Sequence, residues 1–413
     1  MGENIDDYGA TVKKLQTKLL ENPNDADALR DLGVIYFQTS QFDKAADYLK
    51  RSSSANQGDS KTLFYYGMSL EYQGNKEAAL AVYLNYAGAS SLSPYRKLME
   101  GRYQQLTRDI IQKQLQSLIA REDSLTDKKM ASKTVAVFPI VYLGTDERFA
   151  ALGTGLSELM ISDLGQVRNL MLVERIRIEA LLQELNFGAS KFVDPATAPR
   201  VGRLLGSGRM VAGTFNVSGN NLLRVDVASY DVPARKFPEP TSQSDALDNL
   251  FRMEKDLVFG VIKQMGITLT PTERAKIQLF PTKNLQAFLA YSIGLEREDV
   301  GDFRSAATYF KEATSLDPGF AQAKAKGDEA DALSSAGGPR EGALAVAQRI
   351  DPPIGPDAAF APRDLLQSRF KNLGDNINSG LVPGAENRKA PEQAASAGAA
   401  VGDLPKPPRP PTR

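Results

Sequence analysis

The stretch LRDLGVIYFQTSQFDKAADYLK (29–50) has a counterpart 34 positions later, LFYYGMSLEYQGNKEAALAVY (63–83). The two copies place leucine, glycine and aromatic residues at matching offsets, so that Gly33 corresponds to Gly67. Residues three and four apart lie on one face of a helix, and each copy is therefore predicted to form a pair of amphipathic helices. A period of this length indicates hairpins that stack into an array with a continuous core.

This pattern resembles the tetratricopeptide family over residues 26–94, and a third match lies at 285–320. The resemblance implies recognition of other proteins, because such repeats bind partners and carry no chemistry of their own. Two adjacent copies need a capping helix, since about three stacked units are usually required for stability. The segment after Ser93 and Pro94 is predicted to be helical to about residue 120. It is interpreted either as a cap that becomes a linker or as a helix that pairs with a copy of itself.

Large side chains are expected on the concave face of the repeats. These predicted partner-binding residues are Arg30, Val34, Phe37, Phe64, Met68 and Tyr72 in the first two units, and Tyr291 and Leu295 in the third. Ordinary exposed surface would not carry so many large apolar groups. Two interpretations stay open: the groove holds a partner peptide or helix, or it holds part of this chain, such as the helix predicted at 94–120.

Histidine and cysteine are both absent from the 413 residues. Their absence excludes disulfides, thiol chemistry and Ser–His or Cys–His catalysis, and it removes the usual zinc ligands. Gly153 and Gly155 begin a motif like GxGxxG, but its third glycine is missing and the segment is predicted to be helical. Helix packing is therefore favoured over nucleotide binding. We expect no enzymatic activity, no metal and no cofactor.

Basic and acidic residues balance at 50 each, without long blocks of one sign, so no nucleic-acid partner is expected. No stretch approaches 18 apolar residues, and no membrane-spanning helix is predicted. The amino-terminal MGENIDDYG has no hydrophobic targeting core. Either the protein is cytosolic, or the numbering begins after a removed signal.

The middle of the chain changes to an alternating strand and helix pattern. TVAVFPIVY (134–142) reads as a buried strand, and 170–173 as a short second strand. Residues 210–218 and 222–230 alternate in polarity around a Gly-Asn-Asn turn, which predicts a β-hairpin. Helices are predicted at 147–167, 175–185, 195–205 and 245–265, with Asp194 as the N-cap of the third. This order fits a mixed sheet with helices packed on it.

The same region resembles the curli secretion channel family (CsgG-like) and the related TolB amino-terminal domain. The matching stretches are VAVFPI (135–140), LVERIRIEALLQEL (172–185) and VGRLLGSGRMVAGTFNVSGNNLLRVDVASYDV (201–232). The resemblance implies an extracytoplasmic, often outer-membrane-associated, non-enzymatic protein whose copies assemble side by side into a homo-oligomer. Many relatives are lipoproteins, so an anchor cysteine is expected upstream of Met1, or there is no anchor.

Channel members of that family carry two long insertions that form membrane-crossing β-hairpins. The corresponding gaps here are 219–221 and the polar, proline-rich 233–244. A membrane-crossing strand needs about 9–11 residues with an alternating apolar face. We therefore expect no pore from this domain.

The predicted architecture is α+β and multidomain, with helical tetratricopeptide repeats flanking a mixed α/β CsgG/TolB-like domain and a disordered tail. The boundaries are 1–125 for the first repeats, 133–270 for the α/β domain and 283–335 for the last repeat. Residues 336–413 form the tail, with a short helix at 363–373.

The predicted function is that of a cell-envelope scaffold or adaptor, periplasmic or associated with the outer membrane of a bacterium. It binds partner proteins through repeat grooves and supports assembly of a surface or secretion structure. Two alternatives are a lipoprotein-type regulator of a cell-wall synthase and a small-molecule sensor that uses a cleft in the α/β domain.

Overall fold

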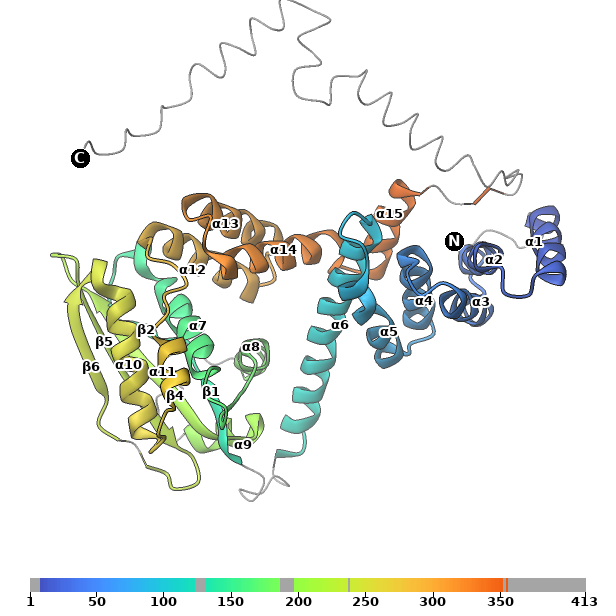
Figure 1. Cartoon of the computed structure of the whole chain (residues 1–413). Helices are drawn as coiled ribbons and strands as arrows, with labels where there is room; N and C mark the ends of the chain where they lie inside the picture. Colours follow the sequence, from blue (N-terminus) through green and yellow to red (C-terminus); the bar gives the residue numbers. More distant parts are fainter. Residues whose placement is uncertain (1–7, 123–130, 186–196, 237, 352–353, 356–413) are drawn as a thin grey trace, which may run out of the picture. The chain divides into compact units, whose positions relative to one another are not determined.

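The computed structural model describes residues 8–122, 131–185, 197–236, 238–351 and 354–355 (Figure 1). Residues Met1–Ile354 form one compact unit, to which the whole description below refers. The predictions for Asp194 and for the helix at 363–373 lie outside the described residues.

The first repeats begin with α1 (Gly9–Glu21) and continue with the hairpins α2 (Ala26–Gln38)–α3 (Phe42–Ala55) and α4 (Ser60–Tyr72)–α5 (Lys76–Tyr83). A short 3-10 helix (Leu84–Gly88) then leads to the long helix α6 (Pro94–Ile119). Glycine recurs in these hairpins because the paired helices approach closely. A Cβ on Gly33 would lie 2.5 Å from Cγ of Leu49, and one on Gly67 would lie 2.3 Å from the Tyr83 ring.

The last repeat consists of α12 (Leu285–Asp299) and α13 (Phe303–Leu316), followed by α14 (Ala321–Ala336) and α15 (Arg340–Ile350). Helix α15 corrects the prediction that the disordered tail begins at residue 336. Its Ala343 and Ala347 are buried, and the helix packs on α6. The helix was not predicted because a segment rich in alanine, glycine and proline is typical of disorder. Alanine, however, is also the strongest helix former.

The α/β domain contains a mixed sheet in the order β3-β1-β4-β5-β6. Its strands are β1 (Ala131–Val137), β2 (Val141–Tyr142), β3 (Met171–Leu172), β4 (Ser207–Val217), β5 (Leu222–Asp231) and β6 (Thr241–Ala246). β1 pairs in parallel with β3 and β4, and β2 also pairs with β4. β4, β5 and β6 are antiparallel. The predicted mixed sheet and its central hairpin are therefore confirmed.

Helices connect and cover the strands. They are α7 (Leu152–Leu164), α8 (Arg175–Glu184), α9 (Ala198–Leu205), α10 (Leu250–Gln264) and α11 (Pro271–Ile277), with 3-10 turns at Glu147–Phe149 and Leu247–Asn249. Gly153 and Gly155 lie in α7, where a Cβ would meet the Ile140 carbonyl oxygen and Ser292 Oγ, respectively. The glycine motif therefore serves helix packing, as the sequence indicated.

Three elements differ from the sequence prediction. β6 overlaps the end of the stretch 233–244, where no strand was predicted because its sequence TSQSDA has no apolar alternation. It is held in the sheet by backbone pairing with β5. The single strand predicted at 134–142 divides into β1 and β2. Helix α11 was missed, yet it begins with a capping box between Thr270 and Glu273, a signal that the sequence does carry.

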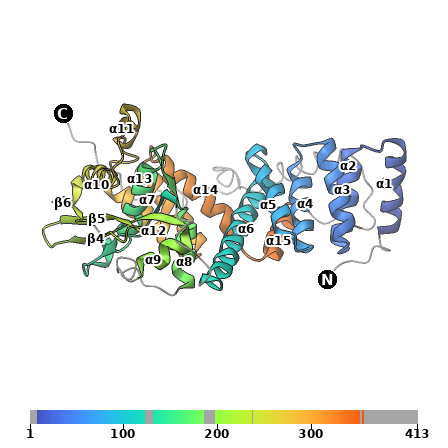
Figure 2. The same cartoon turned by 90° about the horizontal axis from the view of Figure 1, so that it is seen from below.

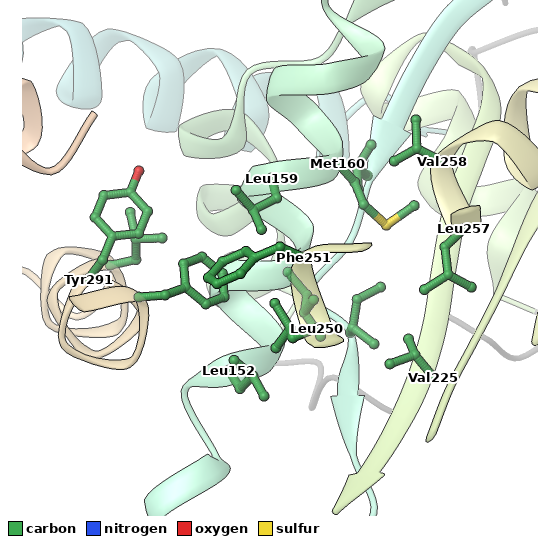
Figure 3. Close-up of a cluster of buried hydrophobic side chains, with 14 of the residues drawn as sticks. Leu152, Leu159, Met160, Val225, Leu250, Phe251, Leu257, Val258 and Tyr291 are labelled. Carbon is green, nitrogen blue, oxygen red and sulfur yellow. The ribbon is translucent and has the colours of Figure 1, made fainter. Parts of the chain in front are cut away.

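Two hydrophobic cores lie on opposite faces of the sheet, since successive strand residues point to opposite sides. On one face, Val135 and Val137 pack with α7, α10 and the aromatic residues of α12 and α13. Figure 3 shows this cluster, with Leu159 and Phe251 of the α/β domain near Tyr291 of the last repeat. On the other face, Ala136 and Phe138 pack with α8, α9 and Leu115 of α6. The domain therefore shares a core with both sets of flanking helices.

Candidate protein-binding surfaces

The predicted groove residues lie on the first helices of the repeats, α2, α4 and α12. The structure buries six of them: Val34, Phe37, Phe64, Met68, Tyr291 and Leu295. Tyr72 is half-buried. These side chains have little exposed surface, so a partner could contact them only if their neighbours moved.

Parts of the same chain cover these side chains. The Phe64 ring centroid lies 5.6 Å from that of Tyr95 in α6. Phe37 packs against the rings of Phe42, Tyr65 and Tyr72. The guanidinium of Arg340, in α15, stacks 4.0 Å from the Tyr72 ring centroid. These contacts favour the interpretation that the chain fills its own groove, and partner binding through these residues stays a prediction.

Arg30 is engaged in ion pairs within the repeats. Its guanidinium lies 2.6 Å from Asp27, 3.0 Å from Asp31 and 3.2 Å from Asp59. Asp59 is also the N-cap of α4, accepting a hydrogen bond from the amide of Lys61. Arg30 therefore joins α2 to the start of the next repeat, which is a structural role.

In the last repeat, Tyr291 lies among aromatic neighbours. Its ring centroid is 5.5 Å from that of Phe310 and 4.8 Å from that of Phe320. Burial raises the pKa of the Tyr291 hydroxyl well above its ordinary value. Tyr291 and Leu295 both belong to the core shared with the α/β domain.

A buried guanidinium ties the first repeats to the end of the last one. Arg102 of α6 donates to both carboxylate oxygens of Glu71 in α4, at 3.0 and 2.5 Å. It also donates to the carbonyls of Ala336 and Gly338, at 3.2 and 2.6 Å. The Tyr83 hydroxyl donates to the same Glu71 carboxylate at 2.8 Å. We call Glu71, Tyr83 and Arg102 the junction triad.

Further contacts join the same helices. The Tyr95 hydroxyl of α6 donates to Asp351 at 2.9 Å, and Lys97 pairs with Asp331 of α14 at 2.7 Å. The two helices also approach closely, because a Cβ on Gly101 would lie 2.3 Å from the carbonyl oxygen of Ala332. Helix α6 is therefore the element on which the helices from both ends of the unit meet. None of these partners could be inferred from sequence, since they lie more than 200 positions apart.

A second cluster of charges joins the α/β domain to the last repeat. Arg175, at the start of α8, lies 3.2 Å from Glu158 of α7, 3.6 Å from Glu298 and 2.5 Å from Asp299. Burial raises the pKa of Asp299 to about 8, although Arg175 opposes the shift. Glu174 is the exposed N-cap of α8, while Arg175 pairs across elements.

Glu298 connects this cluster to two further helices. It pairs with Arg108 of α6 at 2.9 Å and with Lys326 of α14 at 3.0 Å. Although burial opposes ionisation, Lys326, Arg175 and Arg108 together lower the pKa of Glu298. A buried carboxylate of this kind is stable only while its cations stay in place.

One acidic residue inside the α/β domain lacks hydrogen-bond donors. Glu254 of α10 is buried, and neither of its carboxylate oxygens accepts a hydrogen bond. Lys255 lies 3.2 Å from it and 2.5 Å from Asp163 of α7. Burial, followed by the charge of Asp163, raises the pKa of Glu254 to about 8. Both effects favour the protonated form of Glu254.

Within the part of the chain that the structure describes, no group of three or more acidic side chains is arranged to hold a metal ion. None of the described helices combines the length and the apolar character needed to cross a bilayer. The turn between β4 and β5 spans only residues 218–221.

Helical hairpins lie on both sides of a mixed-sheet domain. Residues 129–221 match the family "Curli production assembly/transport component CsgG". Residues 7–60 and 289–320 each match a tetratricopeptide-repeat family. No curated protein matches the chain. The suspected combination of repeats and CsgG-like domain is therefore confirmed.

These families carry coarse functional information. Tetratricopeptide repeats indicate protein–protein interaction, and the CsgG family indicates a role related to curli secretion. The CsgG family is associated with the bacterial outer membrane and periplasm, and neither family is generally enzymatic.

Proposed function

We propose that this protein is a non-enzymatic adaptor of the cell envelope. It binds partner proteins, assembles with copies of itself and supports a surface or secretion structure. The observation that carries the proposal is the junction on α6, where Arg102 holds the first repeats and the α14–α15 segment together. Because the α/β domain shares a core with both sets of helices, the unit presents a CsgG-like domain at a fixed place beside its repeats.

The proposed location is the periplasm or the inner surface of the outer membrane, with or without a lipid anchor. The test is cell fractionation of the native host with an antibody against the full chain, together with photo-crosslinking at exposed repeat positions such as Lys14. We expect the chain in the envelope fraction, with crosslinks to envelope proteins. A purely cytosolic chain would contradict the proposal, as would a purified sample that turns over a substrate.

Self-assembly is proposed to use the outer edge of β6, the last strand in the sheet order. An edge strand offers backbone groups with which a second copy can pair. The residues of β6 alternate between half-buried and exposed, and none of them is fully buried.

The assembly is tested by light scattering on the purified full chain at micromolar concentration. The expected mass is a multiple of the chain mass, and a monomer would contradict the proposal. Successive strand residues send their amide groups to opposite sides. One of the variants Gln243→Pro and Ser244→Pro therefore alters only the outer edge, and we expect it to be folded and monomeric. A folded variant pair that assembles like the parent would place the interface elsewhere.

A further inference from the structure

Helix α6 forms the floor of an open cleft between α5 of the second repeat and α8 of the α/β domain. In both views α6 lies between α8 and α5 (Figures 1 and 2). The cleft has a volume of about 560 Å³ and is lined by all three elements. It lies apart from the covered faces of α2, α4 and α12, so filling of the repeat groove by the chain leaves it open.

The lining of the cleft is predominantly basic. Four of its residues are basic and two are acidic. Asp109 pairs with Lys76 at 2.9 Å, which leaves three basic residues and one acidic residue. Lys113 is exposed on the floor, and Arg177 lines the opposite wall. A ligand with negative charge is therefore favoured over a neutral or cationic one.

Arg177 provides an independent indication of a ligand. Its Nε atom is buried, and among the described residues it has no acceptor. A buried donor without a partner is unfavourable, because it has lost its hydrogen bonds to water and gained none. The planar, charged guanidinium pairs well with a carboxylate. Because Nε itself is covered by the protein, a carboxylate in the cleft pairs with the part of the Arg177 side chain that lines it.

The floor also has an apolar component. Ile110 and Leu118 are half-buried and line the cleft together with Lys113. Their spacing places them on one face of α6. The lining residues of α6 run from Asp109 to Leu118, about 14 Å at 1.5 Å per residue, which is between two and three helical turns. A partner with apolar and acidic residues at helical spacing would match both features.

We propose that this cleft binds an acidic amphipathic helix of a partner protein. One carboxylate lies on Arg177, another approaches Lys113, and apolar side chains rest on Ile110 and Leu118. The inference rests on the proposed adaptor function and names the class of its partner. The apolar stretch at 363–373 of this chain, RDLLQSRFKNL, has three basic residues and one acidic residue. Its net positive charge has the same sign as that of the cleft lining and is repelled by it, so a separate protein is the occupant.

The test selects binders from a random library of phage-displayed 12-residue peptides on the immobilised full chain. Selected peptides are labelled, and their dissociation constants are measured by fluorescence anisotropy. We expect enrichment of Asp and Glu together with Leu or Ile at spacings of three and four. Arg177→Gln and Lys113→Glu should each weaken binding at least ten-fold. Lys14→Glu, an exposed change on α1, should leave it within two-fold.

Lys113 is exposed, so we expect the Lys113→Glu variant to remain folded. It tests the proposal even where Arg177→Gln is unstable. A peptide with serine in place of its apolar residues should bind at least ten-fold more weakly, whereas equal binding would indicate a site for any polyanion and overturn the proposal. Selection without acidic enrichment, or equal affinity for the Lys113→Glu variant, would also overturn it. Envelope location and crosslinking test the adaptor function separately. The peptide-binding result can therefore contradict the cleft proposal without contradicting the adaptor function.

Discussion

Arg102 and Glu71 form a buried, two-pronged ion pair between α6 and α4, and the same guanidinium caps the end of α14. The pair thus lies where the first repeats, the long connecting helix and the carboxyl-terminal helices of the unit meet. Glu71 is held from a third side by the Tyr83 hydroxyl. Desolvation makes each charge dependent on the other, so that loss of one member costs more than the pair itself contributes.

Arg102→Met should lower the free energy of unfolding by about 3 to 5 kcal/mol, because it leaves the Glu71 carboxylate buried without its cation. Urea denaturation followed by circular dichroism measures the loss. The double variant Arg102→Met, Glu71→Met should lose less than the sum of the single variants. Strict additivity would show that the two side chains act independently.

Gly101→Ala should destabilise the unit by about 1 to 3 kcal/mol, because the added Cβ would meet the backbone carbonyl of Ala332 at 2.3 Å. The matched control is Gly342→Ala in α15, where a Cβ meets nothing within 4 Å. That change should stabilise by about 0.5 to 1 kcal/mol through helix propensity. Thermal melts of both proteins test the contrast, and equal shifts would contradict the close crossing of α6 and α14.

Glu254→Gln should remove part of the pH dependence of stability. Burial raises the pKa of Glu254 from 4.5 to about 8 in the folded protein. Its contribution to stability is therefore complete below pH 4.5 and is lost as the pH rises through 8. Each pKa unit corresponds to about 1.4 kcal/mol. We expect the variant to match the parent near pH 5 and to exceed its stability at pH 9, as measured by urea denaturation at both values.

Arg175→Gln should destabilise the unit more at pH 9 than at pH 5. Burial raises the pKa of Asp299 to about 8, so this carboxyl is protonated at pH 5 and needs no cation there. At pH 9 it is ionised and depends on Arg175, which lies 2.5 Å away. Unfolding free energies of parent and variant at the two pH values give the comparison. A loss that does not change with pH would exclude this role of Asp299.

The repeats could be predicted from sequence because their determinants are local. Gly33 faces Leu49, and Gly67 faces Tyr83, only 16 positions away in each case. The β4–β5 hairpin was predictable for the same reason, since alternating apolar residues flank a short turn. β6 was not predictable, because its polar side chains carry no pattern and its pairing with β5 fixes it.

The candidate site was harder to predict than the fold. Amphipathic spacing identified Phe64 and Met68 as a face that must be covered, but it could not say by what. The covering residue Tyr95 belongs to a helix whose own partners, such as Asp351, lie more than 250 positions further along. Likewise, nothing in the sequence marks Arg177 as a basic residue with a buried donor that lacks an acceptor.

The contacts of α6 with Ala336, Gly338 and Asp351 also constrain biosynthesis. A ribosome delivers Arg102 and Tyr95 more than 200 residues before their acceptors. Until then the face of α6 that carries Tyr95 and Arg102 has no cover from these later helices, and a prematurely terminated product keeps that surface exposed. Completion of the nascent polypeptide is thus the event that closes the repeats, and fragments that end within the α/β domain should be the form most readily captured by chaperones and degraded by proteases.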